Sequence, residues 1–495
     1  MIKNKLAELG LLDLFPEMDD EDFQLKHPIL QQIERFKVLD SLKHFESVKQ
    51  SVEKSQVYTT NDVKPIGKDR CIKLANIDFD EKHRILSIGK DAISKGKVAA
   101  VILSGGQGTR LGYNGPKGMY NLGLQSNKTI FQLHIEKIMK IRELSKNEGT
   151  GQLPKVPIYI MTSDLNDTII RDYFNSVNFF GYPRDDIYFF EQGLMPCVSN
   201  DGKIIVETET SLSLAPDGNG GIYYALQLSG AISHMDGLGV EHLHVYGIDN
   251  VLTKSLDPLF LGICIGRGLD CGNKVVKRAS KNEKVGVTTT IENRMHVLEY
   301  SELPAALADA LDDGGNLLFG AANICNHYLS FKFLVNIVLP NLTAQYHLAP
   351  KKIPYLDPIS RKTTTPIRYF LLLLFHNKFY YLIIYSNNGY KLEMFIFDVF
   401  PLAINWLVVE VERFDEFAPV KNEPGNSTDS PDTAIMLMSN QAKRWLLKAG
   451  AKLIDTNTEN KKNEIYEISS LLSYEGEGLD HYNGIDISSP VYLKH

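Results

Sequence analysis

The sequence contains little cysteine and no excess of positive charge. Its 495 residues include five cysteines, and none of them forms a CxxC pair. So few and widely separated thiols exclude the disulfide framework of small secreted domains and favour a reducing compartment, the cytoplasm. The formal net charge is −7, from 53 Lys and Arg against 60 Asp and Glu. This balance argues against a dedicated nucleic-acid-binding protein, which would carry a basic field.

Signs of disorder and of secretion are also lacking. Hydrophobic residues make up 43% of the chain and charged residues 23%, as in ordinary folded proteins. The first residues, MIKNKLAELGLLDLFPEMDD, contain no uninterrupted apolar run before their acidic cluster, so we expect no secretory signal. At about 150 residues per domain, the length predicts two to four domains.

One long apolar segment stands out from this composition. Residues 367–386 read IRYFLLLLFHNKFYYLIIYS, a length that can span a bilayer. His376, Asn377 and Lys378 interrupt its middle, where polar groups are most costly in lipid. Three interpretations remain: a transmembrane helix, an apolar insertion packed as extra strands or forming a partner-binding patch, and a translated non-coding stretch. The abrupt change of composition at both ends favours the last over the second, the first is the least favoured, and we expect no membrane span.

Buried strand patterns alternate with helical patterns from residue 97 onward. Apolar runs predict strands at 97–103, 156–163, 185–192 and 242–250. Helical spacing predicts helices between them, at 129–145 and 220–232. This alternation predicts βαβ units in a doubly wound, Rossmann-like α/β sheet. Ligands of such sheets bind at the carboxyl ends of the strands.

Changes in composition and hydrophobic pattern along the sequence predict four regions. A helical N-terminal region covers 1–95 and the α/β core covers 96–357. The anomalous apolar segment, with its flanks, covers 358–388, and a smaller C-terminal domain covers 389–495. We find no internal repeat of fixed period.

A glycine-rich loop directly follows the first predicted strand and reads LSGGQGTRLG over 103–112. Because glycines lack Cβ atoms, backbone N–H groups there can approach phosphate oxygens. Arg110 adds a permanently charged fork, and Lys117 presents an ammonium a few residues on. The loop has neither the GKS/T of a Walker A motif nor a clean GxGxxG. It nevertheless predicts phosphate or nucleotide binding.

This loop and a series of later motifs resemble the eukaryotic UDP-N-acetylhexosamine pyrophosphorylases, which are UTP:N-acetylglucosamine-1-phosphate uridylyltransferases. The motifs follow in order: LSGGQGTRLGYNGPKGMYNLGL (103–124), PIYIMTS (157–163), FFEQGLMPCVSNDGKII (189–205), LAPDGNGGIYYAL (214–226), HVYGIDNVL (244–252), DCGNKVVKR (270–278), VLEYSEL (297–303), LLFGAANICNHY (317–328), KKIPYLD (351–357), FAPVKN (417–422) and LLSYEGEGLD (471–480). The resemblance covers nearly all of 97–357 and 389–480, and it implies a nucleotidyltransferase core. The apolar segment between these two stretches is extra to the family pattern.

Residue by residue, the resemblance implies how the nucleotide is bound. The turn that would hold its uracil and phosphate end consists of Leu103, Ser104, Gly105 and Gly106. Arg110 and Lys117 would lie against the phosphates. The side-chain amide of Gln192 would read the uracil edge, since an amide offers both a donor and an acceptor.

The resemblance also implies how the sugar is held. Gly218 and Asn219, in APDGNGG, would meet the uridine and the sugar. Glu299 and Asn323 would hold the sugar hydroxyls and the N-acetyl group. The lysines implied to reach the phosphates from the C-terminal part of the chain are Lys391 and Lys421.

A metal site is implied at Asp249, which ends the 242–250 strand in HVYGIDN. A carboxylate there can bind Mg²⁺ held between phosphates, and the family uses this residue in that way. His242 and His244 alternate on the same strand and could be mistaken for a zinc pair. With no third protein ligand in view, we expect these histidines to have a structural role.

The implied reaction is attack by the sugar phosphate on the α-phosphorus of UTP, in line with the departing pyrophosphate. The second pKa of such a phosphate lies near 6, so the attacking group needs no general base. Positioning and charge neutralisation then carry catalysis, with Arg110, Lys117 and Lys421 as the catalytic residues. We expect a cytoplasmic enzyme that is a monomer or weak homodimer and needs neither nucleic acid nor membrane. The alternatives are a uridylyltransferase of broader sugar specificity and a catalytically weak nucleotide-binding protein.

Overall fold

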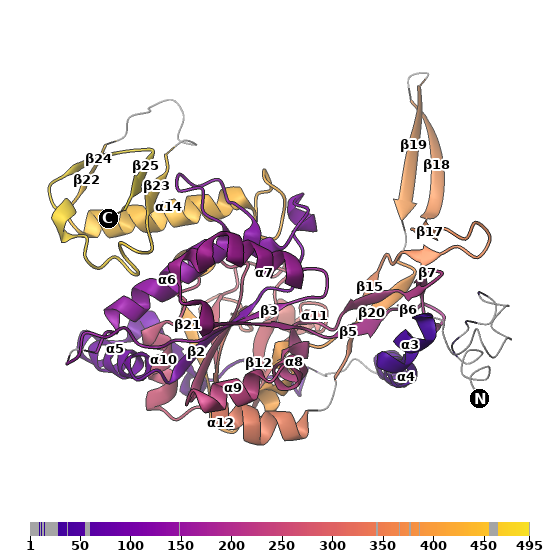
Figure 1. Ribbon diagram of the computed structural model, residues 1–495, viewed down its shortest axis with the longest axis horizontal. Coiled ribbons are helices and arrows are strands. Elements are labelled where there is room, and N and C mark those ends of the chain that lie inside the picture. The colour runs from indigo at the N-terminus through magenta and orange to yellow at the C-terminus, as the bar shows by residue number, and fades with distance from the viewer. Residues whose placement is uncertain are drawn as a thin grey trace. The chain divides into compact units, whose positions relative to one another are not determined.

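The computed structural model describes single positions 9, 11 and 14 and residues 28–36, 38–54, 60–147, 149–342, 345–365, 367–375, 378–385, 387–454 and 464–494 (Figure 1). The chain forms two units, each assembled from three segments of sequence. The small unit comprises Met1–Val57, Gln192–Tyr224 and Thr343–Asp398. The large unit comprises Tyr58–Glu191, Ala225–Leu342 and Val399–His495.

A mixed β-sheet forms the centre of the large unit. In spatial order its main strands are β1 (Cys71–Lys73), β21 (Trp406–Val411), β11 (Cys271–Lys277), β14 (Ala321–Ser330), β10 (His242–Gly247), β2 (Val98–Leu103), β3 (Ile158–Thr162) and β4 (Ile187–Glu191). Strands β10, β2, β3 and β4 run parallel, whereas β14 runs antiparallel to both β10 and β11. The hairpin of β12 (Val287–Ile291) and β13 (Arg294–Leu298) joins the edge of β14.

Helices pack against this sheet around one large apolar core. The helices of the large unit are α5 (Phe79–Ser94), α6 (Ile130–Leu144), α7 (Asp167–Ser176), α9 (Ala231–Gly237), α10 (Pro258–Gly266), α11 (Ala305–Ala308), α12 (Phe331–Phe333), α13 (Arg413–Glu416) and α14 (Pro431–Lys448). Helix α8 (Ile222–Leu228) spans the boundary between the two units. All six residues of β2 are buried, which explains its uninterrupted apolar sequence.

Local signals in the sequence set several helix boundaries. The side chain of Asp257 caps α10 by accepting the Leu259 N–H, and Pro258 takes the first helical position, where no N–H is needed. Ser430 and Thr433 form a capping box at the start of α14. These caps supply partners for backbone groups that the helices themselves leave unpaired.

The C-terminal part of the large unit places two short strand pairs next to α14. These are β22 (Lys452–Ile454) with β24 (Asp486–Ser488), and β23 (Tyr466–Ile468) with β25 (Val491–Leu493). A separate small apolar core joins them to the helix.

The small unit carries two N-terminal helices and several short strands. The helices are α3 (Pro28–Arg35) and α4 (Val38–Lys54). The strands are β5 (Leu194–Pro196), β6 (Val198–Ser199), β7 (Val206–Thr208), β8 (Ser211–Leu212), β9 (Leu214–Pro216), β15 (His347–Lys351), β16 (Tyr355–Leu356), β17 (Thr363–Thr364) and β20 (Gly389–Glu393). Strand β20 lies between β15 and β6, and the two helices pack on their apolar side chains.

The predicted α/β fold is confirmed in its general class. The predicted strands at 97–103, 156–163, 185–192 and 242–250 correspond to β2, β3, β4 and β10. The helix predicted at 129–145 is α6, while the one predicted at 220–232 is divided between α8 and α9. The helices of the region 1–95 belong to different units, because α3 and α4 lie in the small unit and α5 in the large one.

The apolar segment forms two paired strands in place of a helix. Strands β18 (Ile367–Phe375) and β19 (Lys378–Tyr385) run antiparallel and pair with no other strand among the described residues (Figure 1). Within the described part of the chain, every helix is too short or too polar to cross a membrane. The interpretation of this segment as a transmembrane helix is therefore wrong. His376 and Asn377 lie outside the described residues.

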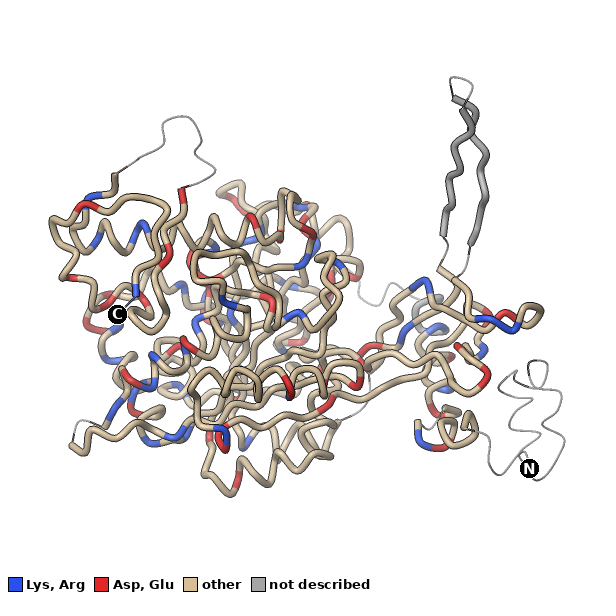
Figure 2. Tube along the Cα trace, turned by 45° about the horizontal axis from the view of Figure 1, so that its top comes forward, with Lys and Arg blue, Asp and Glu red and all other residues tan. Residues whose placement is uncertain are grey.

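Basic and acidic residues are interspersed along the chain of both units (Figure 2). This distribution agrees with a formal net charge of only −7. A binding site for a polyphosphate must therefore obtain its positive charge from a few particular side chains.

Candidate active site

The glycine-rich loop begins at the carboxyl edge of the parallel strands. The carbonyl of Leu103, the last residue of β2, accepts the Ile248 N–H at 3.1 Å from the chain that follows β10. The N–H of Ser104 donates to the Met161 carbonyl of β3 at 3.0 Å. These two bonds fix the start of the loop between its neighbouring strands, where ligands of such sheets bind.

Asn166 supports the loop from the turn after β3. Its Nδ2 donates to the Gly105 carbonyl at 3.0 Å, and its Oδ1 accepts Nε2 of Gln107 at 2.5 Å. The Gly106 carbonyl in turn accepts the Lys117 N–H at 3.2 Å. A Cβ atom placed on Gly106 would meet no heavy atom within 4 Å. Hydrogen bonds to Asn166 and Lys117 therefore fix the loop, while the space next to Gly106 is open to a ligand.

Lys117 and Asp249 form an ion pair next to this loop. The Lys117 Nζ lies 3.7 Å from Oδ2 of Asp249. Burial works to raise the pKa of Asp249, but the positive charges of Lys117, Lys421 and Arg110 outweigh it and hold that pKa below its usual value. Asp249 is therefore ionised at neutral pH. The structure brings together four of the residues that the sequence predicted for phosphate and metal binding, namely Arg110, Lys117, Asp249 and Lys421.

Lys421 reaches this place because its segment runs alongside the chain that follows β10. The N–H of Val420 donates to the Asp249 carbonyl at 2.9 Å, and Asn250 pairs with Pro419 in a β-bridge. The Ala418 N–H donates to Oδ1 of Asn250 at 2.8 Å. These contacts join two stretches that lie far apart in the sequence and set Lys421 close to Asp249.

The two residues expected at the sugar lie on either side of Gly286. The N–H of Asn323 donates to the Gly286 carbonyl at 2.8 Å. A Cβ on Gly286 would lie 3.3 Å from Oε1 of Glu299. The structure thus brings the Glu299 carboxylate and the Asn323 backbone to one place in the large unit.

Cys325 lies between these residues and Asp249, a position that sequence reasoning missed. A Cβ on Gly247 would lie 3.0 Å from Oδ1 of Asp249 and 3.7 Å from the Cys325 sulfur. Burial, followed by the charge of Asp249, raises the pKa of the Cys325 thiol to about 12, so the thiol is neutral at physiological pH. Its backbone has a positive φ of 51°, which only the folded structure reveals.

The remaining predicted residues belong to the small unit. They are Gln192, Gly218, Asn219 and Lys391. Gln192 is buried, and Lys391 lies on β20 opposite Ala349. Oδ1 of Asn219 accepts the Ile396 N–H at 3.0 Å, which fixes the turn that follows β9.

Asp217, next to Gly218, is another residue that sequence reasoning missed. It is 5% exposed, and in the described part of the chain its Oδ1 has no hydrogen-bond partner. Cβ atoms on Gly193 and Gly221 would lie 2.4 Å and 2.0 Å from its carboxylate oxygens. The carboxyl group therefore fits only because both neighbours are glycine. Burial raises its pKa to about 7.

His242 and His244 are engaged in hydrogen bonds within the fold. Nε2 of His244 pairs with Oδ1 of Asn326 at 2.8 Å, and its Nδ1 accepts the Leu256 N–H at 2.9 Å. Nδ1 of His242 pairs with the Tyr328 hydroxyl at 2.9 Å. Both nitrogens of His244 are thus occupied, which fits the structural role expected for it.

The chemistry of Asp249 fits magnesium. Among the residues that the structure describes, no three His, Cys, Asp or Glu side chains gather to hold a metal ion. Mg²⁺, however, is commonly bound by one or two carboxylates while substrate phosphates and water supply its other ligands. A single ionised carboxylate beside the open glycine-rich loop suits that mode of binding.

Comparison with known proteins gives the family. Residues 41–469 match the family model of the UTP–glucose-1-phosphate uridylyltransferases. The chain belongs to this uridylyltransferase family. The family is one of enzymes that act on UTP and a sugar phosphate, so the predicted class of enzyme is confirmed.

Relatives in this uridylyltransferase family are similar over most of the chain. The human UDP-N-acetylhexosamine pyrophosphorylase-like protein 1 is 38% identical over an alignment of 444 positions that covers 87% of this chain and 84% of that protein. The UDP-N-acetylglucosamine pyrophosphorylase of Saccharomyces cerevisiae is 33% identical over an alignment of 497 positions that covers 97% of each chain. The crystal structure of the uridine diphosphate N-acetylglucosamine pyrophosphorylase from Trypanosoma brucei matches with a TM-score of 0.76 at 28% identity, covering 95% of this chain and 91% of that one. The resemblance found in the motifs is confirmed.

Proposed function

We propose that this uridylyltransferase joins UTP and N-acetylglucosamine 1-phosphate to give UDP-N-acetylglucosamine and pyrophosphate. The family match supports the uridylyl transfer, and the names of the human and yeast relatives support the sugar. The observation that carries the proposal is the group of three cations, Arg110, Lys117 and Lys421, whose charges act on Asp249. The backbone of one of them, Lys117, is bound to Gly106, beside which the glycine-rich loop leaves open space.

In the proposed reaction, an oxygen of the sugar phosphate attacks the α-phosphorus of UTP. A new bond forms between this oxygen and the α-phosphorus. At the same time the bond breaks between the α-phosphorus and the oxygen that bridges it to the β-phosphorus, and pyrophosphate leaves with the electron pair. Because the attacking phosphate is largely dianionic at neutral pH, no side chain has to accept a proton. Arg110, Lys117 and Lys421 are proposed to offset the negative charge that collects on the phosphates in the transition state.

Asp249 is the proposed ligand of Mg²⁺, and the bound ion would neutralise phosphate charge during the transfer. The carboxylate suits this task because the surrounding cations hold its pKa below the usual value. Lys117 is proposed to exchange its contact with Asp249 for a phosphate oxygen when the nucleotide binds. The 3.7 Å separation of the two groups is longer than a hydrogen bond, which supports such an exchange.

Substrate recognition is proposed to follow the residue assignments made from the motifs. Residues proposed to contact the nucleotide or the sugar are Leu103, Ser104, Gly105, Gly106, Gln192, Gly218, Asn219, Glu299, Asn323 and Lys391. We also propose that the sheet of the large unit is a Rossmann-like core, since β10, β2, β3 and β4 are parallel and the glycine-rich loop follows β2. The cytoplasmic location and the monomeric or weakly dimeric state stay predictions.

A panel of sugar 1-phosphates tests the proposed function. The purified protein is incubated with UTP, Mg²⁺ and the 1-phosphates of N-acetylglucosamine, N-acetylgalactosamine, glucose or galactose, and pyrophosphate release is followed. The proposal predicts the highest kcat/KM for N-acetylglucosamine 1-phosphate. Preference for glucose or galactose 1-phosphate would show a uridylyltransferase of another or broader specificity. No release with any sugar, despite calorimetric binding of UTP, would show a nucleotide-binding protein.

A further inference from the structure

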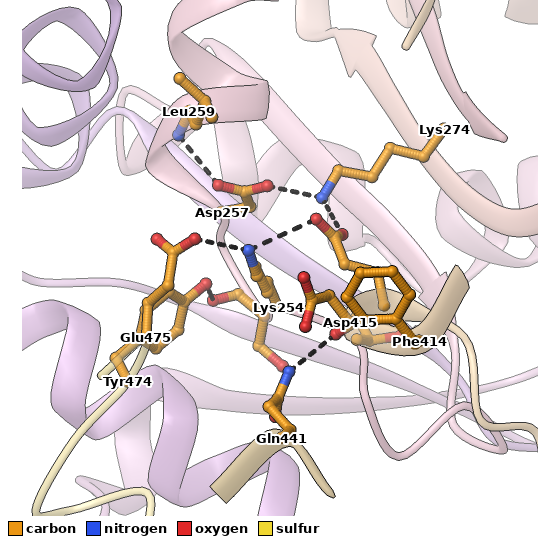
Figure 3. Close-up of polar contacts among 12 residues, drawn as sticks. Lys254, Asp257, Leu259, Lys274, Phe414, Asp415, Gln441, Tyr474 and Glu475 are labelled. Carbon is orange, nitrogen blue, oxygen red and sulfur yellow. Dashed lines mark hydrogen bonds and ion pairs between the residues drawn. The ribbon is translucent and has the colours of Figure 1, made fainter. Parts of the chain in front are cut away.

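A cluster of charged side chains lies next to the turn that follows Asp249. We define this charge cluster as Lys254, Asp257, Lys274, Glu416 and Glu475. Lys274 is fully buried, and its Nζ lies 2.5 Å from both Asp257 and Glu416. The Lys254 Nζ lies 2.6 Å from Glu475 and 3.5 Å from Glu416. Figure 3 shows Lys254, Asp257, Lys274 and Glu475 converging on one place.

Glu416 is the member of the charge cluster that both lysines share. Its Oε1 faces Lys254 and its Oε2 faces Lys274, while the residue is only 2% exposed. Burial works to lower the pKa of Lys274, but the charges of Asp257 and Glu416 outweigh it and raise that pKa above its usual value. Loss of the Glu416 charge would therefore leave the buried ammonium of Lys274 with Asp257 alone, and the partly exposed ammonium of Lys254 with Glu475 alone.

Glu416 also begins the segment that carries Lys421. Its carbonyl accepts Nδ2 of Asn250 at 2.7 Å. Further along, the Val420 N–H donates to the Asp249 carbonyl at 2.9 Å. The 416–421 segment thus runs beside the start of the turn after β10, with the charge cluster at one end and the pair of Asp249 and Lys421 at the other.

Ion pairs of this kind are a poor source of stability, because the cost of removing charges from water offsets much of their attraction. A cluster of ion pairs between the turn after β10 and the 416–421 segment is better explained by a role in fixing the relative position of these two segments. We propose that Glu416 is a positioning residue of the active site, which holds Lys421 and Asp249 at the separation that the transfer reaction needs. This inference rests on the proposed function and adds a residue that no motif of the sequence indicated.

The variant Glu416→Gln tests the proposal, since it keeps the shape of the side chain and removes its charge. We expect kcat to fall about tenfold or more, because small displacements of reacting groups are costly. The Kd for Mg²⁺-UTP, measured by calorimetry, should rise several-fold, whereas KM for the sugar phosphate should change little. Glu136→Gln is a matched control: Glu136 is 4% exposed and binds Lys128 at 2.5 Å and Gln132 at 2.9 Å, neither of which belongs to the cluster. It should lower the thermal midpoint and leave kcat unchanged.

The conservative variant Glu416→Asp separates positioning from stability. It restores the negative charge that Lys254 and Lys274 face, so kcat and the Kd for Mg²⁺-UTP should return toward the wild-type values, whereas a lowered thermal midpoint alone should leave both unchanged, as in Glu136→Gln. Wild-type kcat and Mg²⁺-UTP affinity in Glu416→Gln, or the same loss of kcat in Glu136→Gln, would overturn the positioning role. A wild-type protein that binds Mg²⁺-UTP but releases no pyrophosphate would refute the proposed function, and the Kd comparison would still decide the role of Glu416.

Discussion

The ammonium of Lys117 lies 3.7 Å from a carboxylate oxygen of Asp249, and the backbone N–H of the same lysine is bound to the Gly106 carbonyl. Lys117 therefore links the open part of the glycine-rich loop to Asp249, which lies just beyond the end of β10. A change in the loop would move the lysine, and a change in the lysine would alter the charge around Asp249. Both groups lie where the proposed reaction needs charge neutralisation.

Lys117→Met should lower kcat by about 10²- to 10³-fold, the usual cost of removing one group that stabilises transition-state charge. The thermal midpoint should stay close to that of the wild type, since Asp249 retains Lys421 and Arg110 nearby. Steady-state kinetics and thermal unfolding measure the two effects. Lys95→Met is the control, because it breaks only an exposed pair with Asp91 and should leave kcat unchanged. A kcat within error of the wild type in Lys117→Met would remove this lysine from the proposed mechanism.

Two glycines of the same loop region should respond in opposite ways to alanine. In Gly106→Ala the added methyl meets no atom of the protein, so stability should be kept, while KM for UTP should rise about tenfold because a methyl group occupies ligand space. In Gly118→Ala the methyl would lie 2.4 Å from the fully buried Phe131 ring, which should cost about 1–3 kcal/mol of stability. Thermal unfolding and UTP kinetics of both variants check this contrast. A destabilised Gly106→Ala with normal KM would contradict it.

The buried carboxyl of Asp217 predicts a pH-dependent stability difference. Its pKa is raised from 3.8 to about 7 in the folded protein, so between these values the folded state binds more protons than the unfolded state. The contribution of Asp217 to the free energy of unfolding is therefore fully present below the pKa that this group has in the unfolded state. It is lost as the pH rises through the pKa that the group has in the folded state. Asp217→Asn has no such loss, so its thermal midpoint relative to the wild type should increase from pH 5 to pH 8. A difference that stays constant over this range would show that Asp217 is ionised throughout.

The hairpin of β18 and β19 should be dispensable. Its strands pair only with each other among the described residues, and their backbone register matches Ile367 with Tyr385. The chain on either side is held independently, since Thr363 donates to the Glu207 carbonyl and Asn388 exchanges hydrogen bonds with Ile353. Replacing residues 368–384 by an Asn-Gly turn should leave kcat and the thermal midpoint unchanged.

Kinetics and thermal unfolding of the shortened chain test this expectation. Loss of activity or of folded protein would show that the hairpin contributes to the fold. Sequencing the transcript across codons 358–390 provides an independent test of the translated non-coding interpretation. A transcript that contains the segment would refute that interpretation.

Local patterns were sufficient to predict the central strands and the glycine-rich loop. Strand β2 is buried along its whole length, so its sequence is continuously apolar and unambiguous. The segment 367–385 shows the limit of such reasoning, because hydropathy and length alone do not separate a membrane helix from two strands. Its β-branched and aromatic residues fit the strands that the structure contains.

Local sequence patterns could not predict the contacts that the site makes between residues far apart in the chain. The β-bridge between Asn250 and Pro419 joins residues far apart in the chain, and no spacing in the sequence predicts it. The positive φ of Cys325 and the fit of Asp217 between two glycines also depend on tertiary packing. The family motifs predicted that Lys421 acts with Asp249, but the support for both from Glu416 emerged only from the folded chain.

The most direct test of the central claim is the ³¹P NMR spectrum of the purified protein with UTP, Mg²⁺ and N-acetylglucosamine 1-phosphate. The proposed function predicts that the signals of UTP and of the sugar phosphate decline together. The signals of the UDP-N-acetylglucosamine diphosphate and of free pyrophosphate should grow in equal amounts, and Arg110→Ala should slow all four changes. Release of inorganic phosphate without the sugar nucleotide, or unchanged spectra from folded protein that binds UTP, would contradict uridylyl transfer to this sugar.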